Sequence, residues 1–141
     1  PEAIARVMTT FLGTVSFAHG ERPAYVRLRA LFVPSASLIR TSGSAPEVWT
    51  VNEFVRARQA VFDAGELFSF EETELSDTTE LFGNIAHRFS RYAKRGATNR
   101  EAIDTRGAIS TQFIRTPEGW RISSMAWDDE RPRRRAARTR G

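Results

Sequence analysis

The chain has 141 residues, no cysteine and a formal net charge of +4. A chain of this length is expected to form one domain and to bury roughly two-thirds of its surface. The lack of cysteine excludes disulfides, thiolate metal sites and a cysteine nucleophile.

The first half of the chain has the pattern of helices. Apolar side chains recur at helical spacing over residues 3–16, and His19-Gly20 interrupts them. Pro23 suits the first turn of a second helix, and residues 37–40 predict a short strand.

A capping box predicts where the third helix begins. Thr50 and Glu53 have the spacing at which each side chain can bond the other's backbone. Gly65 marks the expected end of this helix.

From Leu67 onward the apolar period changes to two, which is typical of strands. We expect turns at Asp77-Thr78 and over residues 116–119. The predicted strands cover residues 67–75, 82–95, 104–115 and 120–129. Short turns between consecutive strands favour antiparallel pairing, and helices against such a sheet indicate an α+β domain.

Four segments resemble the nuclear transport factor 2-like superfamily, in particular its SnoaL-like branch. They read LRALFVPSASLI, NIAHRFSRYAKR, RGAISTQF and GWRISSMAWDDE, and they extend the likeness over residues 3–130. The resemblance implies a cystatin-like cone over residues 1–130, with three N-terminal helices packed in a strongly curved antiparallel sheet. It also implies a pocket at the open end of the cone and a homodimer formed through the outer sheet face. Its members include isomerases, dehydratases, hydrolases, cyclases and proteins of no known activity, so the fold does not select a reaction.

The isomerase chemistry of this superfamily does not carry over to this chain. The resemblance places its general base and its protonated acid at Arg40 and Ala108. Neither residue is a carboxylic acid, which argues against that mechanism in its known form.

The resemblance also implies which strand faces line the pocket. The inward set comprises Arg88, Ser90, Tyr92, Ser110, Gln112, Met125, Trp127 and Asp129. A few polar groups in an apolar lining are typical of a small-molecule site. The alternative is a wet core in which these polar groups satisfy one another.

Three residues are candidates for catalysis: Asp129, Tyr92 and His87. Arg88 is expected to pair with Asp129, which would either hold a carboxylate base in place or leave Arg88 as an anion site. His87 falls on the opposite face of its strand, where we expect a dimer interface; a pocket role is the alternative.

The remaining signals concern metals, cofactors and the acidic stretch. No histidine–carboxylate cluster has metal-ligand spacing and no glycine-rich phosphate loop occurs, so neither metal nor cofactor is predicted. We interpret the acidic stretch as a solvated face; it comprises Asp63, Glu66, Glu71, Glu72 and Glu74.

The basic charge is concentrated at the C-terminus. Six of the 21 Lys and Arg residues lie within 131–141, so the rest of the chain carries 15 basic and 17 acidic residues, a net charge of −2. This Arg-rich tail is predicted to be disordered. Nucleic-acid binding would depend on the tail alone, and the acidic body argues against it.

No apolar run is long enough to span a membrane, and residues 1–16 lack a signal-peptide pattern. We therefore expect a cytoplasmic protein. The sequence predicts a pocket that binds an apolar oxygenated small molecule, with cofactor-independent acid–base isomerase, cyclase or dehydratase chemistry as one interpretation. The alternative is a non-catalytic dimeric ligand-binding or scaffold domain.

Overall fold

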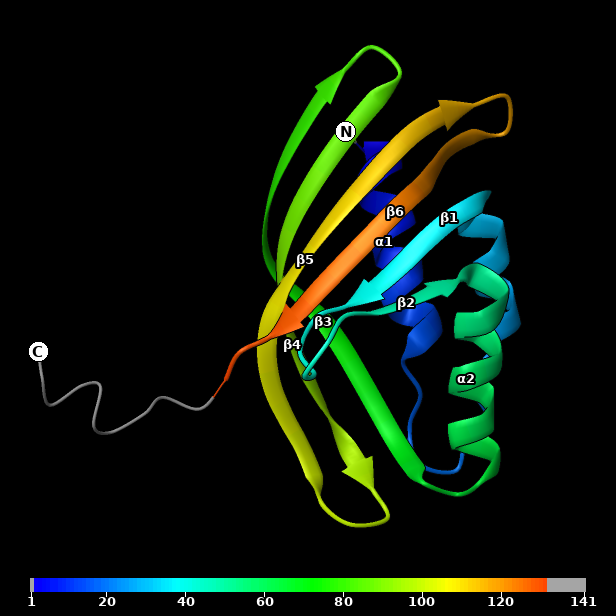
Figure 1. Ribbon diagram of the computed structural model, residues 1–141, viewed down its shortest axis with the longest axis vertical. Coiled ribbons are helices and arrows are strands. Elements are labelled where there is room, and N and C mark those ends of the chain that lie inside the picture. Colours follow the sequence, from blue (N-terminus) through cyan, green and yellow to red (C-terminus); the bar gives the residue numbers. More distant parts are fainter. Residues whose placement is uncertain (1, 132–141) are drawn as a thin grey trace, which may run out of the picture.

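A strongly curved sheet wraps around the helices in the computed structural model, which describes residues 2–131 (Figure 1). The six strands lie in the order β2-β1-β6-β5-β4-β3. The helical elements are α1 (Glu2–Val15), the 3-10 helix η1 (Tyr25–Leu31) and α2 (Val51–Asp63). The strands are β1 (Phe32–Arg40), β2 (Glu47–Thr50), β3 (Leu67–Phe82), β4 (Ile85–Thr98), β5 (Ala102–Thr116) and β6 (Gly119–Asp129).

The α+β architecture agrees with the sequence, but two details differ. The sheet is mixed, because β1 pairs parallel with β6, whereas every other pair of neighbours is antiparallel. The three helical elements are not all N-terminal α-helices, since η1 is a 3-10 helix and α2 follows two strands. Strand β2, which the sequence analysis missed, leads directly into α2 and forms an edge of the sheet.

The largest difference between the predicted and the observed strands concerns the end of β3. It continues through the expected turn at Asp77-Thr78 and ends at Phe82. The chain reverses at Gly83, whose φ of 57° lies in the left-handed region that glycine adopts without strain. A register shift between Glu74 and Ser76 lets this long strand follow β4 without ending.

Helix α2 begins as predicted. The Glu53 N–H donates to Thr50 Oγ1 at 3.1 Å, and the Thr50 N–H donates to Glu53 Oε1 at 2.9 Å, which completes the capping box. Gly65 follows the helix with a φ of 73°. The cap therefore fixes where α2 starts above the sheet.

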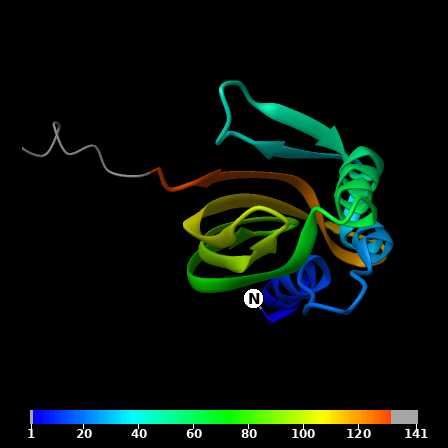
Figure 2. The same cartoon turned by 90° about the horizontal axis from the view of Figure 1, so that it is seen from below.

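The core lies between α1 and the concave side of the sheet (Figure 2). From α1, Ile4 and Met8 are fully buried, and they belong to the same core cluster as the equally buried sheet residues Leu38, Phe113 and Ile122. Each such side chain contributes roughly 1.5–3 kcal/mol through removal from water.

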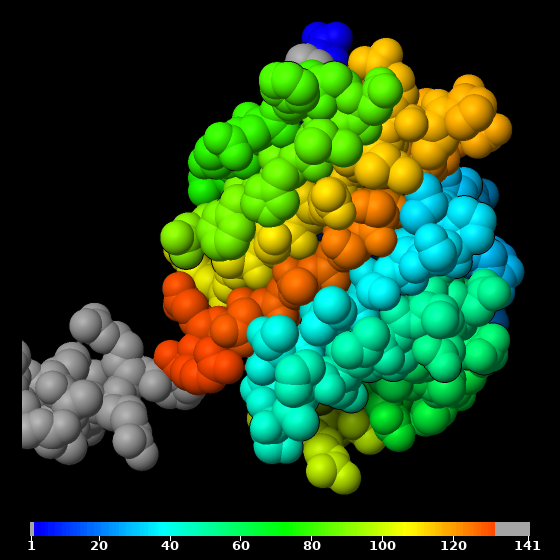
Figure 3. Space-filling view, turned by 45° about the horizontal axis from the view of Figure 1, so that its top comes forward, coloured from blue at the N-terminus to red at the C-terminus, as the bar shows by residue number. Residues whose placement is uncertain are grey.

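The sheet also has a solvent-facing surface. In the space-filling view, β1, β6, β5 and the β3–β4 hairpin follow one another across this surface (Figure 3). Along β4 the side chains alternate, so that Ala86, Arg88 and Ser90 are buried whereas His87 and Phe89 are exposed. No helix among residues 2–131 is long and apolar enough to cross a membrane. Most of the predicted disordered tail lies outside the described residues; Arg131 is its only described member.

Candidate functional site

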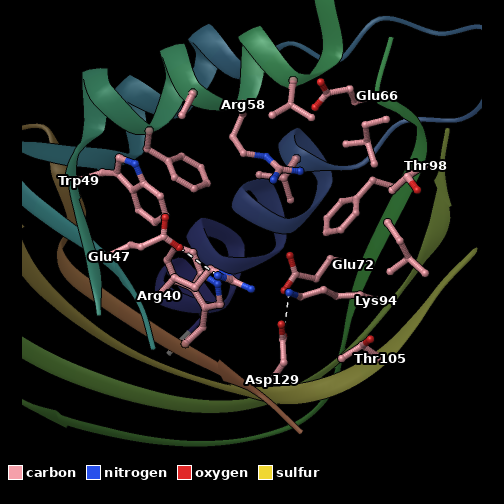
Figure 4. A pocket seen from close by; sticks show the side chains of 18 of the residues that line it. Arg40, Glu47, Trp49, Arg58, Glu66, Glu72, Lys94, Thr98, Thr105 and Asp129 are labelled. Carbon is pink, nitrogen blue, oxygen red and sulfur yellow. Dashed lines mark hydrogen bonds and ion pairs between the residues drawn. The ribbon is translucent and has the colours of Figure 1, made fainter. Parts of the chain in front are cut away.

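A cavity of about 910 Å³ lies between α2 and the concave face of the sheet (Figure 4). Side chains from α1, α2 and all six strands contribute to its lining. This volume is within the range of small-molecule sites.

An aromatic wall closes one side of the cavity. Trp49 of β2 and Trp127 of β6 are nearly parallel, with ring centroids 6.2 Å apart and an interplanar angle of 9°. Phe54 of α2 meets both indoles edge-on, at centroid distances of 5.7 and 5.8 Å. The other apolar lining residues are Phe11, Val15, Ala57, Val61, Leu67, Phe70, Ile103, Ile109 and Met125.

Opposite the helices, the sheet presents an ion pair. Lys94 Nζ of β4 lies 2.8 Å from Asp129 Oδ1 of β6. The hydroxyl of Tyr92 donates to the same carboxylate, and the backbone N–H of Asp129 donates to Ser42 Oγ at 2.9 Å. Burial opposes ionisation of Asp129, but the hydrogen bonds from Lys94 and Tyr92 outweigh it and hold the pKa of this carboxyl below its ordinary value.

Glycine at position 107 makes room for the Tyr92 hydroxyl. Gly107 pairs directly with Tyr92 in the register between β4 and β5, and a Cβ there would overlap both the Tyr92 hydroxyl and the carbonyl of Asp128. Burial raises the pKa of Tyr92, and the neighbouring Asp129 carboxylate raises it further, so Tyr92 acts as a donor.

The carboxyl group of Glu72, on β3, forms no ion pair with any residue in the range 2–131. It projects into the cavity beside Lys94 (Figure 4). Burial raises the pKa of Glu72 to about 7; Lys94 and Arg58 oppose this increase and the charge of Asp129 adds to it. The group therefore exchanges its proton near neutral pH, as an acid–base catalyst must.

Arg58 extends from α2 toward the centre of the cavity (Figure 4). Its guanidinium carbon lies 5.5 Å from the centroid of the Phe70 ring. At the rim, Arg40 NH1 pairs with Glu47 Oε1 at 2.9 Å. The cavity thus combines an apolar wall with several charged groups around its centre.

The structure places only some of the predicted site residues in this lining. Met125, Trp127 and Asp129 line the cavity. Tyr92 lies on the same concave face and contacts the cavity through Asp129. Arg88 and Ser90 are buried on that face but lie outside the lining.

Arg88 does not pair with Asp129. Its Nε and NH2 donate to the two carboxylate oxygens of Glu74 at 3.0 and 2.7 Å, and NH2 also lies 3.1 Å from Asp77 Oδ2. Ser90 donates to Glu74 as well, at 2.6 Å. The prediction of Arg88 as an anion site is wrong, because its donors are already bound to Glu74, Asp77 and Thr79.

The prediction that Ser110 and Gln112 face the pocket is also wrong. Directly paired residues of antiparallel strands share a face, and Ser110 pairs with exposed Phe89 and Gln112 with exposed His87. Ser110 Oγ lies 2.9 Å from His87 Nε2 on the outer face. A one-residue error in the register of a strand moves every side chain to the opposite face.

Glu72, Lys94 and Arg58 are among the cavity residues that the sequence did not predict. Glu72 was assigned to a solvated acidic face, although it continues the alternation that buries Phe70. Lys94 is the only lysine of the chain and pairs in register with Glu72. The period-two pattern of β3 was sufficient to place Glu72 on the concave face. It does not show that Asp129 of β6, far away in the sequence, pairs with Lys94.

Comparisons with known proteins identify the fold. No protein-family profile matches the chain, and no curated protein matches it in sequence. Among solved structures, the Kfla4162 protein from Kribbella flavida superposes with a TM-score of 0.76 at 14% identity, covering 99% of this chain and 96% of that one. An NTF2-like protein with a cystatin-like fold from Novosphingobium aromaticivorans gives a TM-score of 0.70 at 16% identity, covering 98% and 86%.

A third similar structure, from Streptomyces avermitilis, carries a provisional assignment as a dehydratase of the NTF2-like family. Its TM-score is 0.72 at 16% identity, and the match covers 93% of this chain and 96% of that one. The chain therefore has the cystatin-like fold that NTF2-like proteins among these structures share, which is the fold that the sequence resemblance implied. At these identities the likeness establishes the fold and leaves the chemistry to the site.

Proposed function

We propose that this protein binds an apolar, oxygenated small molecule and transfers a proton within it, with Glu72 as the acid–base group. The observation that carries the proposal is a cavity-facing carboxyl whose pKa is raised to about 7. Such a group accepts a proton in its ionised form and returns it in its protonated form without a cofactor.

The proposed step begins at a carbon next to a carbonyl. The Glu72 carboxylate takes a proton from that carbon, and the electron pair of the C–H bond moves to the carbonyl oxygen to give an enolate. Lys94, which is held in place by Asp129, still has N–H donors that can stabilise this oxygen. In a substrate with a β,γ double bond the enolate is conjugated, and return of the proton from Glu72 to the γ-carbon completes an isomerisation. In a β-hydroxy substrate the enolate expels the hydroxyl group, which takes the proton from Glu72 and leaves as water, so that the reaction is a dehydration.

The surroundings of Glu72 support a substrate that is mainly apolar. Trp49, Phe54 and Trp127 provide a continuous aromatic surface beside the charged cluster. An apolar wall with a few convergent polar groups is the usual composition of such sites. An apolar, oxygenated substrate also agrees with the resemblance of the sequence to the SnoaL-like branch.

The test uses a ketone with acidic α-hydrogens, 2-tetralone, in deuterated buffer. We expect the protein to accelerate deuterium incorporation at the α-carbons, measured by NMR, with a rate that rises as pH increases through about 7. Glu72→Gln should abolish the acceleration, and the exposed neighbour Glu71, changed to Gln, is the matched control. Equal rates for the Glu72→Gln and wild-type proteins would sink the proposal.

A non-catalytic, dimeric ligand-binding domain is the second candidate, and the outer sheet face favours it. Phe82, Ile85 and Phe89 are exposed there, Phe82 to 84%. Ile85 and Phe89 flank His87 on the same face of β4, and Phe82 pairs with Ile85, which supports our proposal that this histidine belongs to a homodimer interface. Sedimentation equilibrium should show a dimer that Phe89→Asp dissociates, whereas Val26→Asp, an exposed position on η1, should not. A monomeric wild-type protein would contradict the dimer.

A further inference from the structure

Two polar groups beside the cavity have no role in the proposed proton transfer: Arg58 of α2 and Tyr25 of η1. Tyr25 is fully buried, and within residues 2–131 its hydroxyl makes no hydrogen bond of acceptable geometry. Burial raises the pKa of Tyr25, and the nearby guanidinium of Arg58 opposes this increase. Because a buried hydroxyl is normally satisfied, Arg58 is the nearest partner for Tyr25, and the other N–H groups of its guanidinium remain for a ligand.

Arg58 differs from the other two cations labelled in Figure 4. Arg40 is paired with Glu47, and Lys94 is paired with Asp129. Arg58, by contrast, forms no ion pair with any described residue, and one face of its guanidinium is covered by Phe70. Its guanidinium lies in the cavity lining, near the centre of the view in Figure 4.

We propose that Arg58 binds the carboxylate of an apolar monocarboxylic acid, whose hydrocarbon or aromatic part packs on the Trp49–Trp127 wall. The inference rests on the proposed function, since it names the class of ligand for the same cavity. A planar guanidinium matches a carboxylate with two parallel hydrogen bonds. The enclosed, partly apolar setting strengthens such a pair relative to one exposed to water.

The charge balance of the cavity centre favours a ligand with one negative charge. The pairs Arg40–Glu47 and Lys94–Asp129 are neutral overall, and the exposed lining residues Glu66 and Arg100 carry opposite charges. A protonated Glu72 therefore leaves the charge of Arg58 as the net charge of the lining. One carboxylate neutralises that charge. A phosphate dianion would place an additional negative charge near Asp129 and Glu72, which opposes its binding.

Anchoring at Arg58 would also orient the ligand for proton transfer. Arg58 and Glu72 enter the cavity from α2 and β3, on opposite sides, and the charge of Arg58 opposes the rise in the pKa of Glu72. A carboxylate held at Arg58 places the adjoining carbons between the helix and the sheet, where Glu72 projects (Figure 4).

The experiment compares 4-phenylbutanoate with its methyl ester by isothermal titration calorimetry on the full chain. The two probes share the apolar part and differ in the charged group. We expect the wild-type protein to bind the acid about 10- to 100-fold more tightly than the ester, the range of one charge-assisted hydrogen-bonded pair. Arg58→Gln should reduce the affinity for the acid to that for the ester and leave the ester unchanged. Arg56→Gln, an exposed arginine on the same helix, should keep the wild-type preference.

The possible outcomes separate this inference from the proposed function. Equal wild-type affinities for acid and ester, or an unchanged preference in Arg58→Gln, would overturn the assignment of Arg58 and leave the cavity proposal standing. Failure of both probes to bind would remove the ligand site, and with it both proposals. If Arg58→Gln does not fold, Arg58→Lys replaces it: a preference reduced at least about threefold supports bidentate binding, whereas an unchanged preference contradicts it.

Discussion

Lys94 stands directly opposite Glu72 in the register between β3 and β4, yet its ammonium group forms its ion pair with Asp129 of β6, at 2.8 Å. Glu72 is consequently close to a cation that is already neutralised. This arrangement explains why burial dominates and why the pKa of Glu72 rises to about 7. The raised pKa of Glu72 thus depends on a third residue, Asp129, which takes Lys94 as its own ion-pair partner.

Replacing Asp129 should lower the pKa of Glu72 toward the ordinary value for glutamate. In Asp129→Asn, Lys94 loses its partner and the negative charge that raises the pKa of Glu72 disappears. We expect the pKa of Glu72 to fall by about one unit or more, measured by carbon-13 NMR of the side-chain carboxyl. The control is Asp128→Asn, because Asp128 is directed to Arg131 outside the cavity. An unchanged titration in Asp129→Asn would show that Asp129 does not control Glu72.

Glu72 should also make stability depend on pH. Its folded-state pKa is about 7 and its ordinary value is 4.5, so the folded protein binds this proton more tightly than the unfolded chain does. The free energy of unfolding should therefore decrease as the pH rises from 4.5 to 7, and the full cost should be present above 7.

Glu72→Gln removes that cost because glutamine does not ionise. We expect the variant to be more stable than the wild type at pH 8 by up to about 3 kcal/mol, and to differ little at pH 4. Urea unfolding at both pH values measures the effect, with Glu71→Gln as the exposed control. A stability difference that does not change with pH would contradict this account.

Gly107 should be intolerant of a side chain. A Cβ at this position would overlap the Tyr92 hydroxyl and the carbonyl of Asp128, and the carbonyl cannot move without shifting the strand. We expect Gly107→Ala to destabilise the protein by about 1–3 kcal/mol in urea unfolding. Gly13→Ala is the matched control, since nothing lies within 4 Å of its Cβ and alanine favours the helix. Equal stabilities for the two variants would mean that the strand accommodates the methyl group.

The Arg88–Glu74 pair should matter for stability and not for ligand binding. Arg88 is buried, and Glu74 accepts two of its hydrogen bonds. Glu74→Ala leaves this cation with only Asp77 as a carboxylate partner, which should cost about 3 kcal/mol in urea unfolding. The folded variant should still bind 4-phenylbutanoate with wild-type affinity, because neither residue lines the cavity. A selective loss of binding without loss of stability would contradict this structural role.

Local patterns in the sequence were sufficient for the elements that depend on neighbouring residues. The capping box at Thr50 and Glu53 located the start of α2, and the period-two pattern located four of the strands. Along β4, alternation separated buried Arg88 from exposed His87 correctly. These features depend on contacts within a few residues of one another.

The site itself depends on contacts between distant strands, which local patterns do not determine. The resemblance implied that Ser110 faces inward, whereas the register of β5 against β4, which local patterns do not give, places it on the outer face. Arg88 was paired with Asp129, although both are satisfied by other partners: Glu74 for the arginine and Lys94 for the aspartate. Charged residues on one concave face have several partners in reach, and the curvature of the sheet decides among them.

The titration of the Glu72 carboxyl tests the central claim most directly. Carbon-13 NMR of the side-chain carboxyl, assigned by comparison with Glu72→Gln, reports its protonation between pH 4 and pH 9. We predict a midpoint near pH 7, because the carboxyl is buried in the cavity and Lys94 is already paired with Asp129. A midpoint near 4.5, the ordinary value for glutamate, would contradict the assignment of Glu72 as the proton-transfer group.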